Sequence, residues 1–314
     1  MKVLVAKPRG FCAGVDRAIE IVERALDMYG PPIYVRHAIV HNQRVVKSLI
    51  DKGVIFVEEL DEIKDNNARV IFSAHGVSPA VWKEAGEKGL QSVDAVCPLV
   101  TKVHNEVRHY AEKGYTILLI GHRNHVEVIG TSGEAPQRVI VVESIEEAQS
   151  VFVPEPDKVA YVSQTTLSVD DTRDIVDVLK KRFPYILAPS KLDICYATQN
   201  RQDAVKQLAR HCDVIFIMGS PESSNSNRLV EVAKFSGIEN AFLIGGAEDL
   251  EKTMFSDDIV VGLSSGASTP ETVVEEVIDR LIQFGADSVE ELDGKEEFTR
   301  FPLESSLQFT SPNN

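Results

Sequence analysis

A weak internal repeat is the feature that most constrains how this chain of 314 residues folds. Three segments share one order of parts, namely an apolar strand, a cysteine, a helix, a second apolar strand and a polar loop. The cysteines that define the segments are Cys12, Cys97 and Cys195. Because a repeat of this kind indicates similar units that bury their apolar faces together, we expect three related structural units.

The spacing within the segments supports the repeat. His41, His125 and Asn225 follow their cysteines by 29, 28 and 30 residues, and each stands in the loop after an apolar strand. A second set of strands ends at three serines, which follow the same cysteines by 61, 66 and 69 residues. These serines are Ser73, Ser163 and Ser264. Equivalent loops therefore carry equivalent polar groups.

The alternation of strands and helices predicts the fold class. Apolar, β-branched strands that alternate with helices are typical of parallel sheets flanked by helices. Ligands of such sheets bind beyond the carboxyl ends of the strands, where the polar loops lie. We therefore predict an α/β fold of three small units in a pseudo-threefold arrangement around a central site. The predicted boundaries are 1–96 for the first unit with its N-terminal strand, 97–194 for the second, 195–284 for the third, and 285–314 for a C-terminal tail that packs back on the core.

The composition excludes several classes of function. A formal net charge of −15 leaves no general basic footprint for nucleic acid or an anionic membrane surface. No apolar run approaches the roughly 20 residues of a membrane span, and the run at the start is too short for a signal peptide. We expect a cytoplasmic protein without nucleic-acid or membrane partners. Its four cysteines are then expected to be thiols rather than a disulfide framework.

The three repeat cysteines are candidate metal ligands. A lone buried cysteine is usually a small core hydrophobe, but these three precede helices at matching positions, where the helix N-terminus favours the thiolate. Cys212 has no repeat partner, and we interpret it as a packing residue. The three cysteines match neither zinc-finger nor ferredoxin spacings. They fit an iron–sulfur cluster with one open iron better than a structural zinc.

Polar residues in the repeat loops suggest an anion site. His41, His75 and His125 each stand at the predicted carboxyl end of a strand. The remaining histidines are interpreted as surface or satisfied core residues: His37, His104, His109, His122 and His211. Further donors precede helix starts predicted at Asn227 and near Pro270, whose free N–H groups attract anions. These donors are Ser223, Ser224, Asn225 and Ser268. Together the set can hold a diphosphate without a Walker loop, although each motif singly fits an ordinary helix cap.

An acidic residue and two threonines complete the candidate site. Glu127 in HRNHVE can serve as a proton source if burial or neighbouring negative charge raises its pKa. Thr165 and Thr166 in QTTLS can relay a proton or contact a substrate hydroxyl. Alternatively, Thr166 or Ser168 caps the helix predicted to start near Val169.

A series of motifs in one order gives the chain a family resemblance. The blocks are PRGFCAGVDRAI, YVRHAIVHN, FSAHGVS, CPLVTKVH, GHRNHVEVIGT, SQTTLSVDDT, ICYATQNRQ, SSNSNRL and GASTP. Over nearly the whole chain, the sequence resembles the 4-hydroxy-3-methylbut-2-enyl diphosphate reductases, which end the methylerythritol phosphate route to isoprenoid precursors. The resemblance implies three units around one 4Fe–4S cluster per subunit. Cys12, Cys97 and Cys195 would be its ligands, and the fourth iron would be open to substrate.

The resemblance also implies roles for the polar residues. Glu127 would supply protons with help from Thr165. The diphosphate would be bound by His41, His75, His125, Ser223, Ser224, Asn225 and Ser268. The implied reaction is a reductive dehydroxylation that uses two electrons and two protons and forms isopentenyl and dimethylallyl diphosphates plus water. Its electron donor would be a protein such as flavodoxin or ferredoxin.

Three other functions compete with this interpretation. A non-redox dehydratase would use an open cluster iron only as a Lewis acid and would need no reductant. A cluster-bearing redox or iron sensor would bind a partner and would not need Glu127. A zinc hydrolase is disfavoured because three thiolates suit a reactive zinc-bound hydroxide less well than His and carboxylate ligands do.

Overall fold

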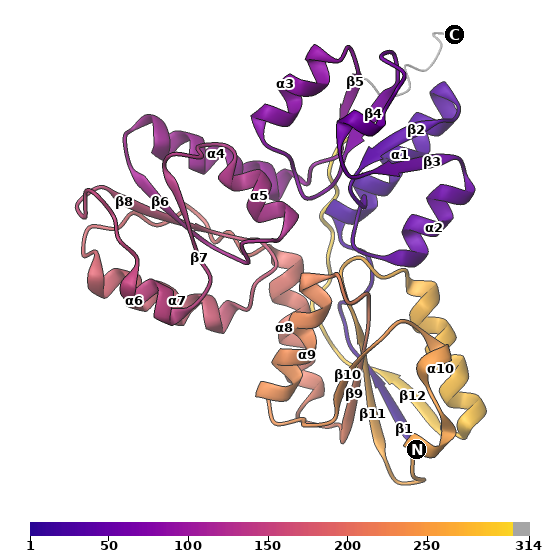
Figure 1. Cartoon of the computed structure of the whole chain (residues 1–314). Coiled ribbons are helices and arrows are strands. Elements are labelled where there is room, and N and C mark those ends of the chain that lie inside the picture. Colours follow the sequence, from indigo (N-terminus) through magenta and orange to yellow (C-terminus); the bar gives the residue numbers. More distant parts are fainter. Residues whose placement is uncertain (304–314) are drawn as a thin grey trace.

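The computed structural model describes residues 1–303, and it contains three parallel β-sheets, one in each of three lobes (Figure 1). The first sheet has the order β3-β2-β4-β5. Its strands are β2 (Ile33–Arg36), β3 (Val54–Val57), β4 (Arg69–Phe72) and β5 (Gln91–Asp94). Its helices are α1 (Ala13–Tyr29), α2 (Gln43–Asp51) and α3 (Pro79–Glu87), with the short 3-10 helix η1 (Leu60–Glu62). The predicted α/β class with parallel sheets is confirmed.

The second and third sheets repeat this strand pattern. The second has the order β7-β6-β8 and contains β6 (Thr116–Ile120), β7 (Val139–Val142) and β8 (Val159–Ser163). Its helices are α4 (Pro98–Glu112), α5 (Val126–Ser132), α6 (Ile145–Ser150) and α7 (Val169–Arg182). The third has the order β10-β9-β11-β1-β12 and contains β9 (Val214–Met218), β10 (Ala241–Ile244), β11 (Val260–Ser265), β1 (Lys2–Val5) and β12 (Ser288–Glu291). Its helices are α8 (Tyr196–Leu208), α9 (Ser224–Phe235), α10 (Glu271–Phe284), η2 (Ala247–Asp249) and η3 (Lys252–Met254).

The N-terminal strand corrects one detail of the predicted first unit. We expected β1 to belong to that unit, but it pairs with β11 and β12 in the third sheet, where Val3 aligns with Val261 and Val289. In the same way, β5 precedes Cys97 but completes the first sheet, and Leu187 before Cys195 bridges to Ala160 of the second. The segment before each cysteine is therefore held by the preceding unit. The other predicted boundaries stay predictions.

Each sheet is buried on both faces, as its composition requires. The strands TILLI and VIFIM are buried at every residue, which is typical of parallel strands covered by helices on both sides. Each of the three sheets has two hydrophobic clusters, one on each face. These rigid layers leave the loops at the strands' carboxyl ends free to form a site.

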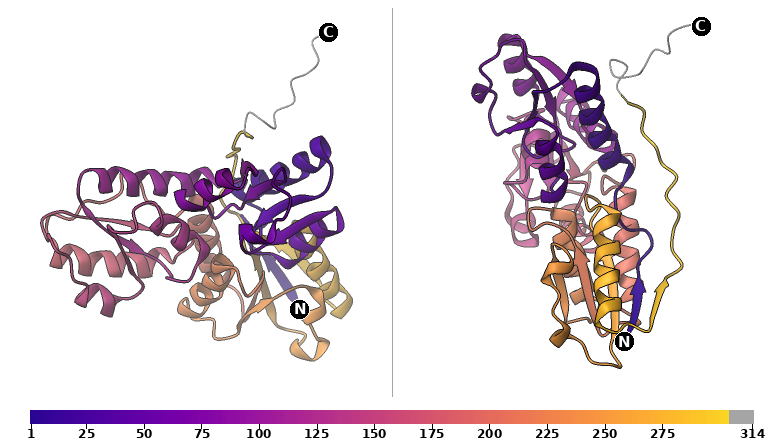
Figure 2. Two further views of the ribbon diagram at one scale, coloured as in Figure 1. Left: turned by 45° about the horizontal axis from the view of Figure 1, so that its top comes forward. Right: turned by 90° about the vertical axis from the view of Figure 1, so that its right-hand side faces the viewer.

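The described part of the predicted tail crosses the molecule after β12. Beyond Glu291 the chain runs as an extended segment along the outside of the third and first units (Figure 2). Glu297 bonds Arg201 of α8, and Arg17 of α1 donates to the Pro302 carbonyl. Residues 304–314 of the predicted tail lie outside the described residues.

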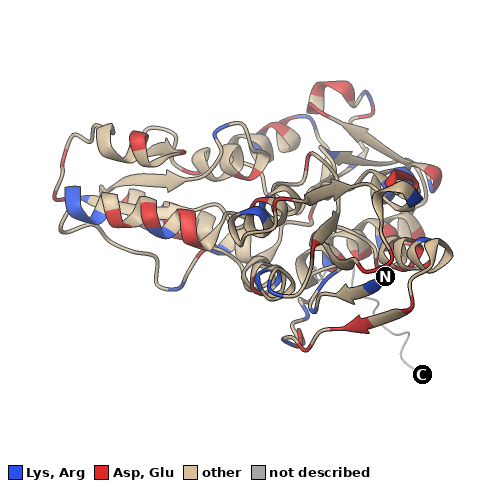
Figure 3. Cartoon of the chain, turned by 90° about the horizontal axis from the view of Figure 1, so that it is seen from below, with Lys and Arg blue, Asp and Glu red and all other residues tan. Residues whose placement is uncertain are grey.

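The surface matches the acidic composition. The view from below shows Asp and Glu intermixed with Lys and Arg rather than a broad basic face (Figure 3). In residues 1–303, no helix combines the length and the apolarity that crossing a bilayer requires.

Candidate functional site

One central cavity of about 110 Å³ collects the residues singled out in the sequence. All twelve predicted site residues line it: Cys12, Cys97, Cys195, Glu127, Thr165, His41, His75, His125, Ser223, Ser224, Asn225 and Ser268. They come from all three units, and most lie in loops after the strands or in the first turn of a helix. The structure therefore brings the residues together, whereas their individual roles stay predictions.

The three cysteines occupy equivalent places in the three units. Cys12, Cys97 and Cys195 are the N-cap residues of α1, α4 and α8. Each follows the segment that enters from the preceding unit, so each thiol lies where two units meet. Because the helix N-termini point their free N–H groups at the cavity, negative charge is favoured there.

Gly14 allows the thiols of two units to approach one another. A Cβ atom at Gly14 would lie 2.7 Å from Cys97 Sγ and 3.9 Å from Cys12 Sγ. Since real Cβ atoms essentially never approach other atoms to 2.7 Å, a side chain here would displace Cys97. Gly14 was not among the predicted site residues, although a glycine in the first turn of a predicted helix is a signal, because glycine is a poor helix former.

Burial controls the protonation of the thiols. It raises the pKa of Cys97 to about 12 and that of Cys195 to about 11, and the neighbouring thiols add to both shifts. The amides of Leu99 and Val100 lower the pKa of Cys97, although neither forms a cap hydrogen bond of good geometry to its sulfur. These thiols hold their protons at neutral pH until a metal cation replaces them.

The arrangement of the thiols fits a cluster better than a single ion. Within residues 1–303, no three His, Cys, Asp or Glu side chains converge closely enough to hold one metal ion. The three thiols instead surround a shared cavity. An iron–sulfur cluster takes one thiolate at each of several irons, so it fits thiols that are spread in this way.

Glu127 is a buried carboxyl with two partners from one residue. It lies in the first turn of α5 and is 3% exposed. The Thr165 amide donates to Oε1 at 2.7 Å, and the Thr165 hydroxyl donates to Oε2 at 3.0 Å. Burial raises the pKa of Glu127 to about 7 against these two hydrogen bonds, and the charge of Asp193 adds to the rise. A carboxyl of this kind can hold and release a proton at neutral pH.

Three histidine rings meet in the cavity. The ring centroids are 4.2 Å apart for His41 and His75, 5.5 Å for His41 and His125, and 6.0 Å for His75 and His125. Burial lowers the pKa of His125 to about 4 and the pKa of His75 well below its ordinary value. Burial also lowers the pKa of His41. The rings are therefore neutral at pH 7 in the free site, and an entering anion would favour their protonation.

The N-terminus of α9 supplies further donors. Ser223 is the N-cap, since its Oγ accepts from the Ser226 amide at 3.2 Å. The helix thus begins at Ser224, three residues before the predicted start at Asn227, because Ser223 takes the capping role. Both side-chain polar atoms of Asn225 are buried without a hydrogen-bond partner. The capping and the binding interpretations of SSNSN are therefore compatible.

The remaining polar residues of the cavity make contacts between units. The Ser268 hydroxyl donates to the His41 carbonyl at 3.1 Å. Pro270 is the N-cap of α10, which begins at Glu271, next to the predicted start. The Thr166 hydroxyl lies 3.2 Å from Ser224 Oγ. Ser168, and not Thr166, caps α7 by accepting from the Asp171 amide.

The lining of the cavity suits an anion of modest charge. None of the described residues that line it is Lys or Arg. Positive potential must come from helix N-termini, hydroxyl and amide donors, and histidines that can take up protons. The unpartnered Asn225 amide and His41 Nε2 are buried donors or acceptors that a ligand would satisfy.

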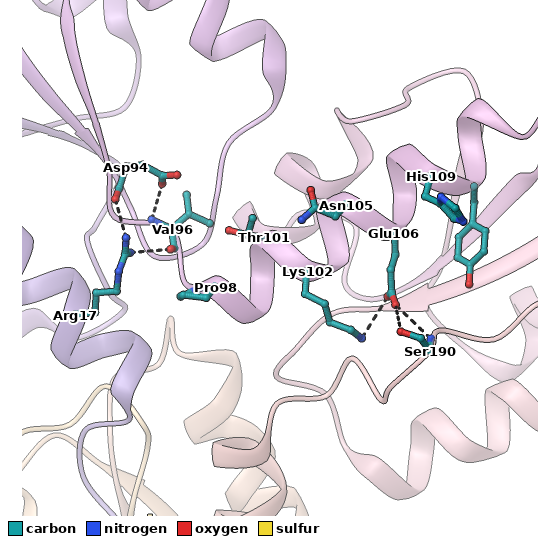
Figure 4. A pocket seen from close by; sticks show the side chains of 11 residues that line it. Arg17, Asp94, Val96, Pro98, Thr101, Lys102, Asn105, Glu106, His109 and Ser190 are labelled. Atoms are coloured by element: carbon teal, nitrogen blue, oxygen red, sulfur yellow. Dashed lines mark hydrogen bonds and ion pairs between the residues drawn. The ribbon is translucent and has the colours of Figure 1, made fainter. Parts of the chain in front are cut away.

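The other cysteine and a second cavity lie apart from this site. Cys212 is buried in the core of the third unit, as its packing interpretation requires. An open cleft of about 750 Å³ runs along α4 and is larger than the central cavity. There Arg17 donates to the Val96 carbonyl, and Glu106 bonds Ser190 (Figure 4). Despite its size, this cleft contains none of the predicted site residues.

Comparison with known proteins gives consistent matches over the whole chain. Residues 3–282 match the family model described as LytB protein. The 4-hydroxy-3-methylbut-2-enyl diphosphate reductase of Pseudomonas putida (strain W619) is 54% identical over 315 residues, which cover 99% of each chain. The protein of the same name from Acidothermus cellulolyticus is 51% identical, with 98% of this chain and 90% of that protein covered.

Solved structures give the same match. The E-1-hydroxy-2-methyl-but-2-enyl-4-diphosphate reductase from Plasmodium falciparum superposes with a TM-score of 0.93 at 40% identity, covering 98% of this chain and 96% of that one. A second structure, of an (E)-4-hydroxy-3-methyl-but-2-enyl diphosphate reductase described as the terminal enzyme of the non-mevalonate pathway, has a TM-score of 0.64 at 34% identity. It covers 90% of this chain and 100% of that one.

Proposed function

Because this chain belongs to the LytB protein family, we propose that it is an oxidoreductase that reduces 4-hydroxy-3-methylbut-2-enyl diphosphate. Two electrons and two protons remove the allylic hydroxyl as water and leave isopentenyl or dimethylallyl diphosphate. The observation that carries the proposal is the single cavity, which combines three thiols, one protonatable carboxyl and a set of anion-binding donors. These are the groups that a reductive loss of hydroxide from a small diphosphate requires.

The thiols of Cys12, Cys97 and Cys195 would hold one 4Fe–4S cluster per subunit. When bound, such a cluster supplies electrons and, at the iron without a protein ligand, Lewis acidity. The chain itself encloses the reacting groups, since Glu127, Thr165 and Thr198 are each at most 5% exposed. Exclusion of water strengthens electrostatic contacts in the site and limits side reactions.

Glu127 would donate protons to the reacting part of the substrate. Its pKa of about 7 leaves a large fraction protonated at neutral pH, so the carboxyl can protonate the departing hydroxyl. The Thr165 amide and hydroxyl hold both carboxyl oxygens and thereby fix their direction. Thr165 would also help to carry the proton, because its hydroxyl contacts Glu127 Oε2.

The histidines and the α9 N-terminus would bind the diphosphate. The binding set is His41, His75, His125, Ser223, Ser224, Asn225 and Ser268. Two helix N-termini, of α9 and α10, lie next to these residues and favour phosphate oxygens. With the diphosphate held there, the allylic end of the substrate would face the cysteines and Glu127.

The electrons would come from an external protein, such as flavodoxin or ferredoxin. Replacing the allylic C–O bond by C–H with release of water is a two-electron reduction, so each turnover needs a reductant. The requirement for a reductant also separates the proposal from the dehydratase, which would turn over without one.

The proposal is tested by anaerobic purification, iron and sulfide analysis, and a dye assay. The protein is expected to be brown and to oxidise dithionite-reduced viologen only when 4-hydroxy-3-methylbut-2-enyl diphosphate is added. Cys195→Ser is expected to lose iron, whereas the matched Cys212→Ser is expected to keep it, since Cys212 lies in the core of the third unit. Turnover without reductant would favour the dehydratase, and a cluster without any turnover would favour the sensor.

A further inference from the structure

The threefold symmetry of the cysteine sites is broken by one hydroxyl group. The residue three positions after each cysteine lines the central cavity, and these residues are Val15, Val100 and Thr198. Valine and threonine have nearly the same shape, so packing alone does not distinguish the three positions. The third unit differs from the other two in presenting an O–H group to the cavity.

The Thr198 hydroxyl contacts the sulfur of its own unit. Thr198 Oγ1 lies 3.2 Å from Cys195 Sγ, and the Thr198 amide donates to the same sulfur at 3.4 Å. Thr198 is 1% exposed, so water does not compete for these contacts. Cys12 and Cys97 receive neither a cap hydrogen bond nor, with valine at the equivalent position, a hydroxyl.

The direction of this hydroxyl is unusual for a helical threonine. Threonines in helices commonly bond the carbonyl three or four residues earlier. Thr101 of α4 does so with the Cys97 carbonyl at 3.4 Å, and Thr172 of α7 does so with the Ser168 carbonyl at 2.6 Å. Thr198 instead directs its hydroxyl at sulfur, the atom that ligates iron in the proposed function.

We propose that the Thr198 hydroxyl donates a hydrogen bond to the cluster-ligating sulfur of Cys195 and thereby raises the reduction potential of the cluster. The inference rests on the proposed function, because it requires a cluster at the three cysteines. A ligating thiolate has no proton of its own, so the hydroxyl becomes the donor in the 3.2 Å contact. Addition of an electron makes the sulfur more negative, and a donor at that sulfur stabilises the reduced state more than the oxidised one. Thr198 would therefore be a positioning residue that acts through Cys195.

The experiment is an anaerobic redox titration of the purified holoprotein with dithionite and mediators, monitored by electron paramagnetic resonance. Thr198→Val removes the hydroxyl and keeps the shape, and Thr198→Ser keeps the hydroxyl. Val100→Thr adds a hydroxyl at the equivalent position beside Cys97. Iron and sulfide content of the wild type is measured first, so that absence of a cluster, which would refute the proposed function, is separated from failure of this inference.

Thr198→Val is expected to lower the reduction potential of the cluster. At a fixed solution potential, the ratio of reduced to oxidised cluster should fall roughly tenfold, which is equivalent to about 59 mV for one electron. Thr198→Ser is expected to stay near the wild type, and Val100→Thr to shift upward. An unchanged potential in Thr198→Val with full iron content overturns the inference. If Thr198→Val does not retain its cluster, Val100→Thr decides, and an unchanged potential there overturns the inference as well.

Discussion

At the scale of single residues, the site depends on carboxyl and imidazole groups whose protonation is set by burial. Glu127 would be ionised at pH 7 in water, but in the cavity its pKa is about 7. The histidines shift in the opposite direction, because burial disfavours their charged form. The cavity therefore carries little net charge before a ligand binds. This suits a site that must admit an anionic substrate and then donate protons to that substrate.

Replacing Glu127 by glutamine is expected to separate binding from catalysis. Glutamine has nearly the same size. Its amide oxygen can still accept from the Thr165 amide, and its NH2 group can donate to the Thr165 hydroxyl oxygen, so cluster content and substrate affinity should stay near the wild type. It cannot donate an acidic proton, so kcat is expected to fall by about a hundredfold or more. Viologen turnover and iron analysis measure the two effects, and a near-wild-type kcat would remove Glu127 from the proton path.

Diphosphate binding is expected to be accompanied by proton uptake. The cavity is lined by no described Lys or Arg, and the pKa of His125 is about 4 in the free site against its ordinary 6.5. A bound anion raises this pKa, so affinity should increase as pH falls from 7.5 towards about 5. Calorimetric titrations in buffers of different ionisation enthalpy would measure the uptake. His125→Gln is expected to reduce it, and equal heats in all buffers would contradict the prediction.

The sequence located the polar residues of the cavity but not the residues that shape it. The cysteines and the loop residues His41, His125 and Asn225 were recognisable because they recur at equivalent positions. Glu127 and Thr165 have no such equivalents, and they were recognised by their loop positions and by the family resemblance. Gly14 was missed because its role depends on the approach of Cys97 from another unit. Gln164 was missed for a similar reason, since it joins the His122 amide to the Thr166 hydroxyl across loops. Such contacts arise from tertiary structure, which local patterns do not encode.

At the scale of elements, the N-terminus of α9 combines capping with binding. Ser223 caps the helix and lines the cavity, so one hydroxyl serves both purposes. The predicted start at Asn227 was wrong because all five polar residues of SSNSN fit a cap. The structure selects Ser223 through its bond to the Ser226 amide.

Ser223→Ala is expected to cost both stability and affinity. Loss of an N-cap hydroxyl typically costs about 1 kcal/mol, and loss of a donor to the diphosphate is expected to raise KM roughly tenfold. Ser168→Ala is the matched control, because Ser168 caps α7 by the same kind of bond but does not line the cavity. It should cost similar stability and leave KM unchanged. Thermal melts and steady-state assays of both variants decide, and equal KM values would place Ser223 outside the binding set.

At the scale of the whole molecule, the three units are linked in a ring by the segments that precede the cysteines. β1 enters from the third sheet, β5 from the first, and the segment with Leu187 from the second. The sequence predicted three units because helix and strand periodicity is local. It misassigned β1 because pairing with β11 joins residues more than 250 positions apart, and an apolar strand alone does not specify its neighbour. Each unit therefore helps to fix the thiol at the start of the next.

The tail after β12 is expected to stabilise the junction at Cys12. Arg201 is fully buried, donates to the Gly10 carbonyl at 2.7 Å, and pairs with Glu297 of the tail at 3.2 Å. Glu297→Gln removes the charge that is paired directly with the buried guanidinium, and breaking a pair of this kind typically costs about 3 kcal/mol. We therefore expect a lower urea midpoint for the anaerobic holoprotein. Iron should also be lost at lower urea, because Arg201 holds the loop that leads to Cys12.

Lys295→Met provides the control within the same tail. Lys295 pairs with Asp203 at 3.1 Å, but both side chains are more than half exposed, so the pair is worth at most about 1 kcal/mol. If the tail acts through the buried pair, only Glu297→Gln lowers the urea midpoint strongly and releases iron early. Equal small effects of the two variants would mean that the tail merely covers the surface, and that the Cys12 loop is held by the Arg201 bonds to its carbonyls without help from Glu297.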